Sequence, residues 1–471
     1  MLQIDELFPQ LNEETRATLE AAPRNEAVVL YHLHDLGPLE AGDRLYVDSK
    51  AARSDAFSNE FLRKLGYFPE QQPPMFLPPK NGKHLLFFGH VGCGKSTELR
   101  RLSAQLQAQD RYWVTHVDLL KLIDPNNVRY CDVWLAATQA LLKHLEDEHI
   151  KIEEAGAKRL YNWFTQTVLT HEKVSELSAE LKTEIEAGYS FPLLGKLVAK
   201  FTSAFKLANT KRETIREVVN NSYGEFIGAL NQLLAAITDG LQRSGKGQLP
   251  LLVIDGPDRF RGDDWRRFFQ DEGIQVTQAQ CVTIYTAPLA LKHNGRPLAQ
   301  FDAVILPMVK LRDFDDGHAL PAAYDMMRLM LLKRAHYSMF ADLQSLDDVI
   351  DYSGGNVRDA LKLLRICCEI VERLPFDRAT VEKAATKLAA EFRHWLKIEH
   401  YQILAQSDLL LNQGHSDDIN YLIEEGALLE YNTGSWRQAH PVLRLLHPFK
   451  LAQEKLAQEA LAQTAAADKT P

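Results

Sequence analysis

The chain has few cysteines and no long apolar run, and both absences limit its class. Its 471 residues include five cysteines without C-x-x-C spacing, namely Cys93, Cys131, Cys281, Cys367 and Cys368. A disulfide framework or a thiolate zinc site is therefore not expected. No apolar run approaches the ~20 residues that cross a bilayer, and Met1 to Thr18 lacks a basic n-region. We expect a cytoplasmic protein without a transmembrane segment.

A large positive charge is also absent. The formal net charge is −9, so the chain as a whole is not attracted to nucleic acid or anionic lipid. Familiar effector signatures are missing too, such as the PD-x-D/E-x-K motif of nucleases and the H-E-x-x-H motif of zinc proteases. If the protein signals, we expect its effector to be a separately encoded protein.

A glycine-rich loop gives the first positive signal. Residues 89–96 read G-H-V-G-C-G-K-S and match G-x-x-x-x-G-K-[ST], a phosphate-binding loop. In such a loop the backbone N–H groups face phosphate oxygens, Lys95 reaches the β- and γ-phosphates, and Ser96 ligates Mg²⁺. A strand over Leu85 to Phe88 enters the loop and a helix over Thr97 to Leu106 leaves it. The expected nucleotide ligands are Gly89, Val91, Gly92, Cys93, Gly94, Lys95, Ser96 and Thr97.

The second signal is an apolar strand, Leu251 to Ile254, that ends in Asp255. Beside the loop, Asp255 would hold Mg²⁺ through water; the alternative is an aspartate that caps the next loop. Many ATPases place a second acid directly afterwards to orient the attacking water, but this chain has Gly256 there. Asp258 is the nearest substitute, unless it only pairs with Arg259. We therefore expect slow hydrolysis.

A third candidate is Thr286, which follows an apolar strand. A hydroxyl at a strand end commonly senses the γ-phosphate of a nucleotide. Threonine is also frequent in strands because of its β-propensity, so both interpretations stay open.

The order of segments predicts an α/β fold with a parallel three-layer sheet, because helical stretches separate the apolar strands. The predicted strands are Leu85–Phe88, Tyr112–Val117, Leu249–Asp255, Gln280–Tyr285 and Ala303–Leu306. We divide the chain into a lead-in and Pro-rich linker (1–80), a phosphate-loop core (81–312) with a helical insertion (about 146–247), a helical segment (313–390), a helix–helix–hairpin segment (391–450) and a frayed Ala/Gln-rich tail (451–471).

These motifs, in this order, resemble those of AAA+/STAND ATPases, including the archaeal Cdc6/ORC-like branch. The resemblance extends over about Asp48 to Leu446 and is specific at four stretches: GHVGCGKSTEL (89–99), VIDGPDR (253–259), SGGNVRDALKLLR (353–365) and LIEEGALLEYNTGSWRQAHPVLRLL (422–446). It implies an AAA+ core, a helical lid over 313–390, a C-terminal winged helix over 391–450, and ATP or ADP bound with Mg²⁺. It does not explain the insertion.

The resemblance also implies roles for three residues. Arg358 would reach from the lid to the γ-phosphate as a second sensor; the alternative is an exposed arginine on the first turn of a helix. Arg296 would be an arginine finger presented to a neighbouring subunit. His440, before Pro441, stands where STAND proteins have a histidine that touches ADP. For the finger, the competing residues are Arg259, Arg266 and Arg267.

Two functions from different classes are compatible with these motifs. The first is a STAND-like switch that exchanges ADP for ATP, forms a nucleotide-dependent homo-oligomer and controls a separate effector, as in bacterial antiphage defence. The second is a Cdc6/ORC-like DNA-binding initiator or loader, whose winged helix should be basic. Acids outnumber bases over residues 391–450, which favours protein contact over DNA.

The insertion leaves further alternatives open. Its basic residues, such as Lys196, Arg212 and Arg216, form either a binding patch or a solvated helix face. The largely apolar segment Phe191 to Phe205 would suit a membrane surface, although packing against the core explains it more simply.

Overall fold

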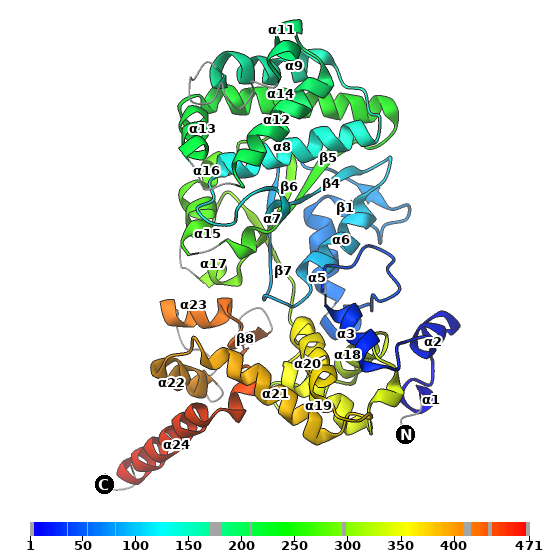
Figure 1. The fold of residues 1–471 in the computed structure, drawn as a ribbon, viewed down its shortest axis with the longest axis vertical. Coiled ribbons are helices and arrows are strands. Elements are labelled where there is room, and N and C mark those ends of the chain that lie inside the picture. The colour runs from blue at the N-terminus through cyan, green and yellow to red at the C-terminus, as the bar shows by residue number, and fades with distance from the viewer. Residues whose placement is uncertain are drawn as a thin grey trace.

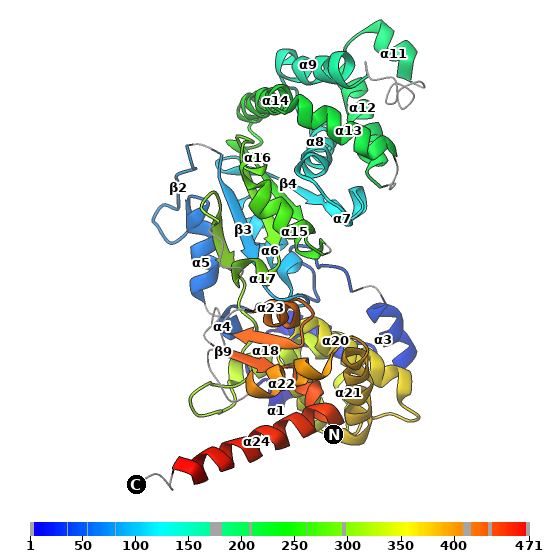
Figure 2. The same cartoon turned by 90° about the vertical axis from the view of Figure 1, so that its left-hand side faces the viewer.

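A parallel sheet lies near the middle of the molecule (Figures 1 and 2). A layer of helices lies at one end of it, and residues 313–467 lie at the other. The computed structural model describes residues 4–34, 36–53, 55–80, 82–169, 181–206, 210–260, 262–293, 298–407, 416–431 and 436–467. Within that part of the chain, no helix is long and apolar enough to cross a membrane.

The sheet has five strands in the order β4–β5–β6–β3–β7, and each neighbouring pair is parallel. The strands are β3 (His84–Phe88), β4 (Tyr112–Asp118), β5 (Leu249–Asp255), β6 (Val282–Ala287) and β7 (Asp302–Ile305). All five predicted strands are therefore present, with β6 starting two residues later than predicted. Because β6 lies between β3 and β5, Thr286 stands between the phosphate loop and Asp255.

Alternate residues of each strand face opposite hydrophobic layers, as a sheet covered on both faces requires. Leu85 and Phe87 pack with Phe61 of α5 (Asp55–Lys64) and with the apolar face of α6 (Lys95–Leu106). Leu86 and Phe88 belong to the other layer, which includes Trp134 of α8 (Tyr130–Asp147). The predicted three-layer α/β architecture is thereby confirmed.

The insertion is a helical layer that covers the outer side of α8 (Figure 1, top). Its elements are α9 (Glu154–Trp163), a π-helical turn (Phe164–Val168), α11 (Lys182–Ala187), α12 (Phe191–Ala204), α13 (Thr210–Asn221) and α14 (Tyr223–Ser244). Leu193, Leu197 and Phe201 of α12 are buried, so this segment packs internally. This burial supports the packing explanation over a membrane surface.

Two arginines of the insertion hold α13 against the core. Arg216 donates through Nε to Asp132 Oδ1 of α8 at 3.0 Å. Arg212 donates to the backbone carbonyls of Asn126 and Asn127, at 2.6 Å each. Both arginines are buried, so neither contributes to an exposed basic patch.

Below the sheet in Figure 1, the segment predicted to be a lid, which is called the lid from here on, forms α18 (Pro321–Leu332), a 3-10 turn (Tyr337–Met339), α19 (Leu343–Ser353), α20 (Val357–Ile370) and α21 (Arg378–Arg393). The N-terminal helices α1 (Ile4–Leu7), α2 (Glu13–Glu20), α3 (Glu26–Leu33) and α4 (Lys50–Arg53) lie beside it, whereas a small hairpin, β1 (Tyr67–Phe68) with β2 (Met75–Phe76), lies beside the sheet, where Phe76 packs on Tyr112 of β4. Helix α3 packs on α20 (Figure 1). Short helices connect the strands of the core: α7 (Leu119–Leu122), a 3-10 turn (Pro257–Arg259), α15 (Asp264–Arg266), a π-helical turn (Arg267–Asp271), α16 (Gly273–Val276) and α17 (Leu289–His293).

The C-terminal segment contains two helices, an antiparallel hairpin and a long helix. These are α22 (Ile398–Ser407), α23 (Asp417–Glu424), β8 (Leu428–Tyr431), β9 (Trp436–Ala439), a 3-10 turn (Pro441–Leu445) and α24 (His447–Ala467). Residues 451–467, where a frayed tail is expected, continue α24. Its alanine, leucine, glutamine, glutamate and lysine residues are strong helix formers. Residues 468–471 lie outside the described part.

Candidate nucleotide-binding site

The phosphate loop joins β3 to α6, as the motif predicts. Gly92 and Gly94 adopt positive φ angles of 83° and 97°, a conformation that glycine adopts without steric cost. Helix α6 begins at Lys95 directly after Gly94. The unpaired N–H groups and the dipole of its first turn therefore face the loop and favour an anion there.

Lys95 is buried, and its ammonium has three partners. Nζ donates to the carbonyl oxygens of Gly89 at 2.8 Å and His90 at 3.0 Å. It lies 3.0 Å from Oδ2 of Asp258. An ammonium carries three N–H donors, so all three are engaged.

Asp258 is held from both sides. Its Oδ1 accepts the hydroxyl of Thr286 at 2.9 Å, and that hydroxyl accepts the backbone N–H of Gly256 at 2.9 Å. Burial opposes ionisation of Asp258, but the charge and hydrogen bond of Lys95 outweigh it and hold the pKa of this carboxyl below its usual value. Asp258 therefore pairs with Lys95, while the charge of Arg259 has a smaller effect.

Asp255 ends β5 next to Ser96. Burial, together with the negative charge of Asp258, raises the pKa of Asp255 above its usual value; the hydrogen bond with Ser96 opposes this. A cavity of about 20 Å³ is lined by Ser96, Asp255, Asp118 and their neighbours, which is room for about one water molecule. A hydroxyl and a carboxylate suit Mg²⁺, which usually takes one or two protein ligands and completes its shell with water and phosphate oxygens. Within the described ranges no group of three or more His, Cys, Asp or Glu residues could hold a metal.

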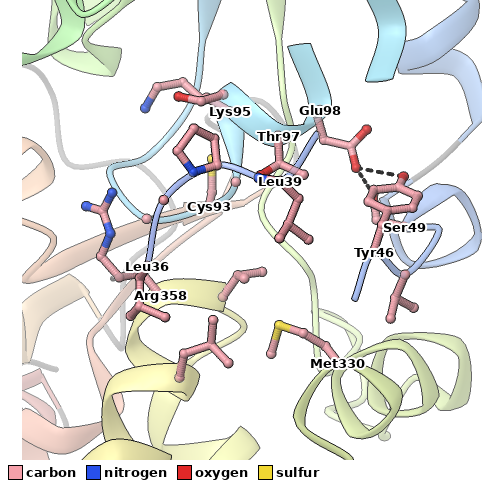
Figure 3. Close-up of a pocket in the computed structure, with 18 of the residues that line it drawn as sticks. Leu36, Leu39, Tyr46, Ser49, Cys93, Lys95, Thr97, Glu98, Met330 and Arg358 are labelled. Atoms are coloured by element: carbon pink, nitrogen blue, oxygen red, sulfur yellow. Dashed lines mark hydrogen bonds between the residues drawn. The ribbon is translucent and has the colours of Figure 1, made fainter. Parts of the chain in front are cut away.

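The lid is attached directly to the loop. The Asn356 side chain donates to the carbonyl of Val91 at 2.9 Å, and the backbone N–H of Arg358 donates to the carbonyl of Gly92 at 3.0 Å. A Cβ atom at Gly92 would come within 2.5 Å of Asn356 Oδ1, so only glycine permits this approach. Arg358 lines the same cavity as Lys95 and lies between the lid and the loop (Figure 3).

The N-terminal segment forms a wall of the site that sequence reasoning missed. The backbone N–H of Leu39 donates to Thr97 Oγ1 at 3.2 Å. Ser49 and Tyr46 donate to Glu98 Oε1 at 2.9 and 3.1 Å (Figure 3). Arg53 donates to the carbonyl of Cys93. No motif marks residues 36–53, because two of these contacts use backbone groups and the other two use common polar side chains.

These walls enclose a cavity of about 190 Å³. Its polar end consists of the phosphate loop with Arg53, Lys95, Asp258 and Arg358. The rest of its lining comes from the N-terminal segment and the lid and is mainly apolar, with Leu36, Leu39, Met326, Met330, Val357 and Leu361 beside the polar His32 and Arg334. A ligand that joins a polyanion to a planar, weakly polar group would suit both parts of this lining.

The other residues that the sequence suggested for the site are placed differently from one another. His440 is buried, with Nε2 3.2 Å from Oδ2 of Asp359, and it does not line the cavity. Arg259 does line the cavity. Arg266 and Arg267 instead pair with the acids three residues before them. Arg296 lies outside the described residues.

No protein-family model matches the chain, and no curated protein matches it. Among solved structures, the chain is similar to the ORC2 protein of Aeropyrum pernix in its ADPNP–ADP complexes, at 12% identity and a TM-score of 0.35, covering 92% of this chain and 98% of that one. It is also similar to a Walker-type ATPase of Pyrococcus abyssi (13% identity, TM-score 0.39, 87% and 98% covered). A third similar structure is the ORC1 protein of Aeropyrum pernix in complex with DNA (14% identity, TM-score 0.35, 92% and 96% covered). At these TM-scores and identities, the similarity supports no statement about the ligands or partners of this chain.

Proposed function

We propose that the protein binds ATP and ADP with Mg²⁺ and hydrolyses ATP slowly. The observation that carries this proposal is one cavity that is lined by the phosphate loop with Lys95 and by mainly apolar side chains of the N-terminal segment and the lid. Phosphates fit the polar end, since backbone N–H groups, a helix N-terminus and a cation converge there. The base of a nucleotide fits the mainly apolar part of the lining.

Six polar residues of the site have proposed roles. Lys95 binds phosphate oxygens, and Ser96 with Asp255 holds Mg²⁺, which would neutralise phosphate charge when bound. Asp258 orients the attacking water, and Thr286 positions Asp258 through the observed hydrogen bond. Arg358 contacts the γ-phosphate from the lid. Hydrolysis is slow because Gly256 offers no carboxylate and Asp258 is neutralised by Lys95.

Calorimetry with ATP and ADP in the presence of Mg²⁺ tests the binding. We expect Lys95→Ala to lower the affinity by at least about tenfold, because charge-assisted hydrogen bonds are lost. The control is Lys246→Ala, which removes an exposed lysine paired with Glu148 at the surface. Equal affinities in Lys95→Ala and the wild type would refute the site.

For the biological role, we propose a STAND-like switch that assembles with nucleotide and controls a separately encoded effector, in a bacterial conflict setting such as antiphage defence. The support is that Arg358 lies on a separate lid segment attached to the loop, together with the lack of an effector motif in the sequence. Co-purification of a genetically linked effector in an ATP-dependent manner tests this role.

The alternative, an initiator or loader that binds DNA, has less support. Acids outnumber bases over residues 391–450, and the insertion arginines Arg212 and Arg216 are used internally. Fluorescence anisotropy of the full chain with labelled duplex DNA separates the two roles. Sub-micromolar, salt-sensitive binding would favour the initiator.

A further inference from the structure

The β8–β9 hairpin is bonded to the phosphate loop through a side chain with no role in the proposed site. The backbone N–H of Glu430 on β8 donates to Nε2 of His90, the second residue of the loop, at 2.7 Å. Both residues are buried, with exposed fractions of 3% for His90 and 4% for Glu430. The acceptor must be a neutral imidazole, and burial lowers the pKa of His90 to about 4, which keeps it neutral near pH 7.

The carboxylate of the same glutamate fixes this strand to the core. Glu430 Oε2 lies 2.8 Å from Nε2 of His293, at the end of α17, and 3.1 Å from Nε of Arg437 on β9. Burial raises the pKa of Glu430, but its bonds and charge pairing with His293 and Arg437 outweigh this and hold it below its usual value. Glu430 is therefore ionised. It connects the hairpin to the phosphate loop through its backbone N–H and to α17, the helix after Thr286, through its carboxylate.

The main chain of His90 is also a partner of the phosphate-binding lysine. Its carbonyl accepts one of the three donors of Lys95, and the other two go to Gly89 and Asp258. A phosphate oxygen can bind this ammonium only by replacing one of these three partners. A phosphate oxygen that replaces the carbonyl of Gly89 or of His90 changes the main-chain bonding next to the His90 ring.

We infer that the β8–β9 hairpin senses the occupancy of the phosphate loop through His90, which acts as a positioning residue. This inference rests on the proposed nucleotide binding. Phosphate contact with Lys95 weakens the bond from Glu430 to His90 and loosens β8, so a nucleotide signal reaches the C-terminal segment. By linkage, if the nucleotide changes the affinity of the hairpin for a partner, that partner changes the affinity for the nucleotide by the same factor.

Hydrogen exchange of the full chain, with and without a non-hydrolysable ATP analogue, tests the coupling. In the wild type we expect the Glu430 amide to exchange faster when the analogue is bound. In His90→Leu that nucleotide-dependent difference should vanish, while the affinity for the analogue rises by about two- to tenfold, the range that one net hydrogen bond represents. A residue that only filled space would not produce this combination.

Gln438→Ala is the matched control, because Gln438 lies on β9 opposite Leu429 and pairs across the hairpin, away from His90. It should keep the wild-type response. If His90→Leu does not fold, His90→Phe decides, since it keeps a planar ring but has no atom that can accept the Glu430 N–H, and the response should again vanish.

Analogue binding without any change in the hairpin would overturn the inference, as would a full response in His90→Leu or, where that variant does not fold, in His90→Phe. Absence of analogue binding to the wild type would instead contradict the proposed nucleotide site, so the two failures can be told apart.

Discussion

At the scale of single residues, Asp258 competes with any phosphate for the cation of the site. Its carboxylate lies 3.0 Å from Lys95 Nζ, where it neutralises the charge that a nucleotide needs. The same carboxylate is the proposed positioner of water, so one residue affects binding and turnover in opposite directions.

We therefore expect Asp258→Asn to bind ATP more tightly and hydrolyse it more slowly. The freed lysine charge strengthens phosphate binding. Loss of the water-orienting base should slow hydrolysis by about 100-fold or more. Calorimetry and single-turnover hydrolysis measure the two effects, and Asp263→Asn, with a side chain 80% exposed beside Arg266, is the control. Unchanged single-turnover hydrolysis would reduce Asp258 to a structural partner of Lys95.

A second residue-scale prediction concerns pH. His84 is buried between the Tyr285 hydroxyl and the Ala279 carbonyl, each 3.1 Å away, and burial lowers its pKa to about 4. Because the unfolded chain binds this proton near pH 6.5, the stability that His84 contributes is complete above pH 6.5 and is lost as the pH falls towards 4. The free energy of unfolding should fall by about 2 kcal/mol between pH 6.5 and 4.5 from this residue alone.

Glutamine can accept from Tyr285 and donate to Ala279 without titrating. Chemical denaturation at several pH values should thus show a shallower acid dependence in His84→Gln than in the wild type. Equal slopes would mean that His84 binds protons equally in the folded and unfolded chain.

At the scale of elements, the residue that caps the N-terminus of α20 also bonds to the phosphate loop. Asn356 accepts from the N–H groups of Arg358 and Asp359 while its amide nitrogen donates to Val91. Asp377 caps α21 in the same way but touches no loop residue. The two caps form a matched pair.

We expect Asn356→Ala and Asp377→Ala to lose similar stability, about 0.5–2 kcal/mol, because each removes one helix cap. Only Asn356→Ala should also lower nucleotide affinity, since it releases the lid from Val91. Thermal denaturation and calorimetry on both variants measure this difference. An equal loss of affinity in Asp377→Ala would show that general destabilisation, rather than the bond to Val91, controls binding.

The elements that the sequence predicted are those whose signal is local. The loop motif, the apolar strands and the capped helix after Gly354-Gly355 each depend on neighbouring residues, and the structure contains all of them. The pairing of Lys95 with Asp258 could not be predicted, because it depends on how the chain turns after β5. The bond between His90 and Glu430 joins residues 340 positions apart. The local sequence around neither residue indicates this contact.

One expectation failed for a physical reason that the local pattern does not contain. Arg212 and Arg216 follow a basic pattern typical of a surface, yet buried acids and carbonyls of the α8 region take up their donors. The helix over residues 451–467 is different, because the helix propensity of its residues is a local property.

At the scale of the whole molecule, we predict that ATP changes the assembly state and ADP does not. Arg358 is placed by a lid that contacts the loop, and Arg296, outside the described residues, is the proposed finger toward a neighbour. A γ-phosphate adds contacts that ADP cannot make, so it favours the closed or assembled state.

Mass photometry with ADP and with a non-hydrolysable ATP analogue should give different mass distributions, and Arg358→Ala should abolish the difference. Equal masses with both nucleotides would indicate a switch confined to one chain.

The attachment of loop residues 90–92 to both the lid and the hairpin also decides how the protein can be divided. His90 is bonded to β8, and Val91 and Gly92 are bonded to the start of α20. A fragment that ends before Leu428 would uncover the buried imidazole, and one that ends at residue 312 would also release the glycine turn that is proposed to bind phosphate. The phosphate-loop core therefore cannot be separated from the rest of the chain without losing these contacts. Nucleotide binding measured on such a fragment would describe a loop whose bonding differs from that of the intact chain.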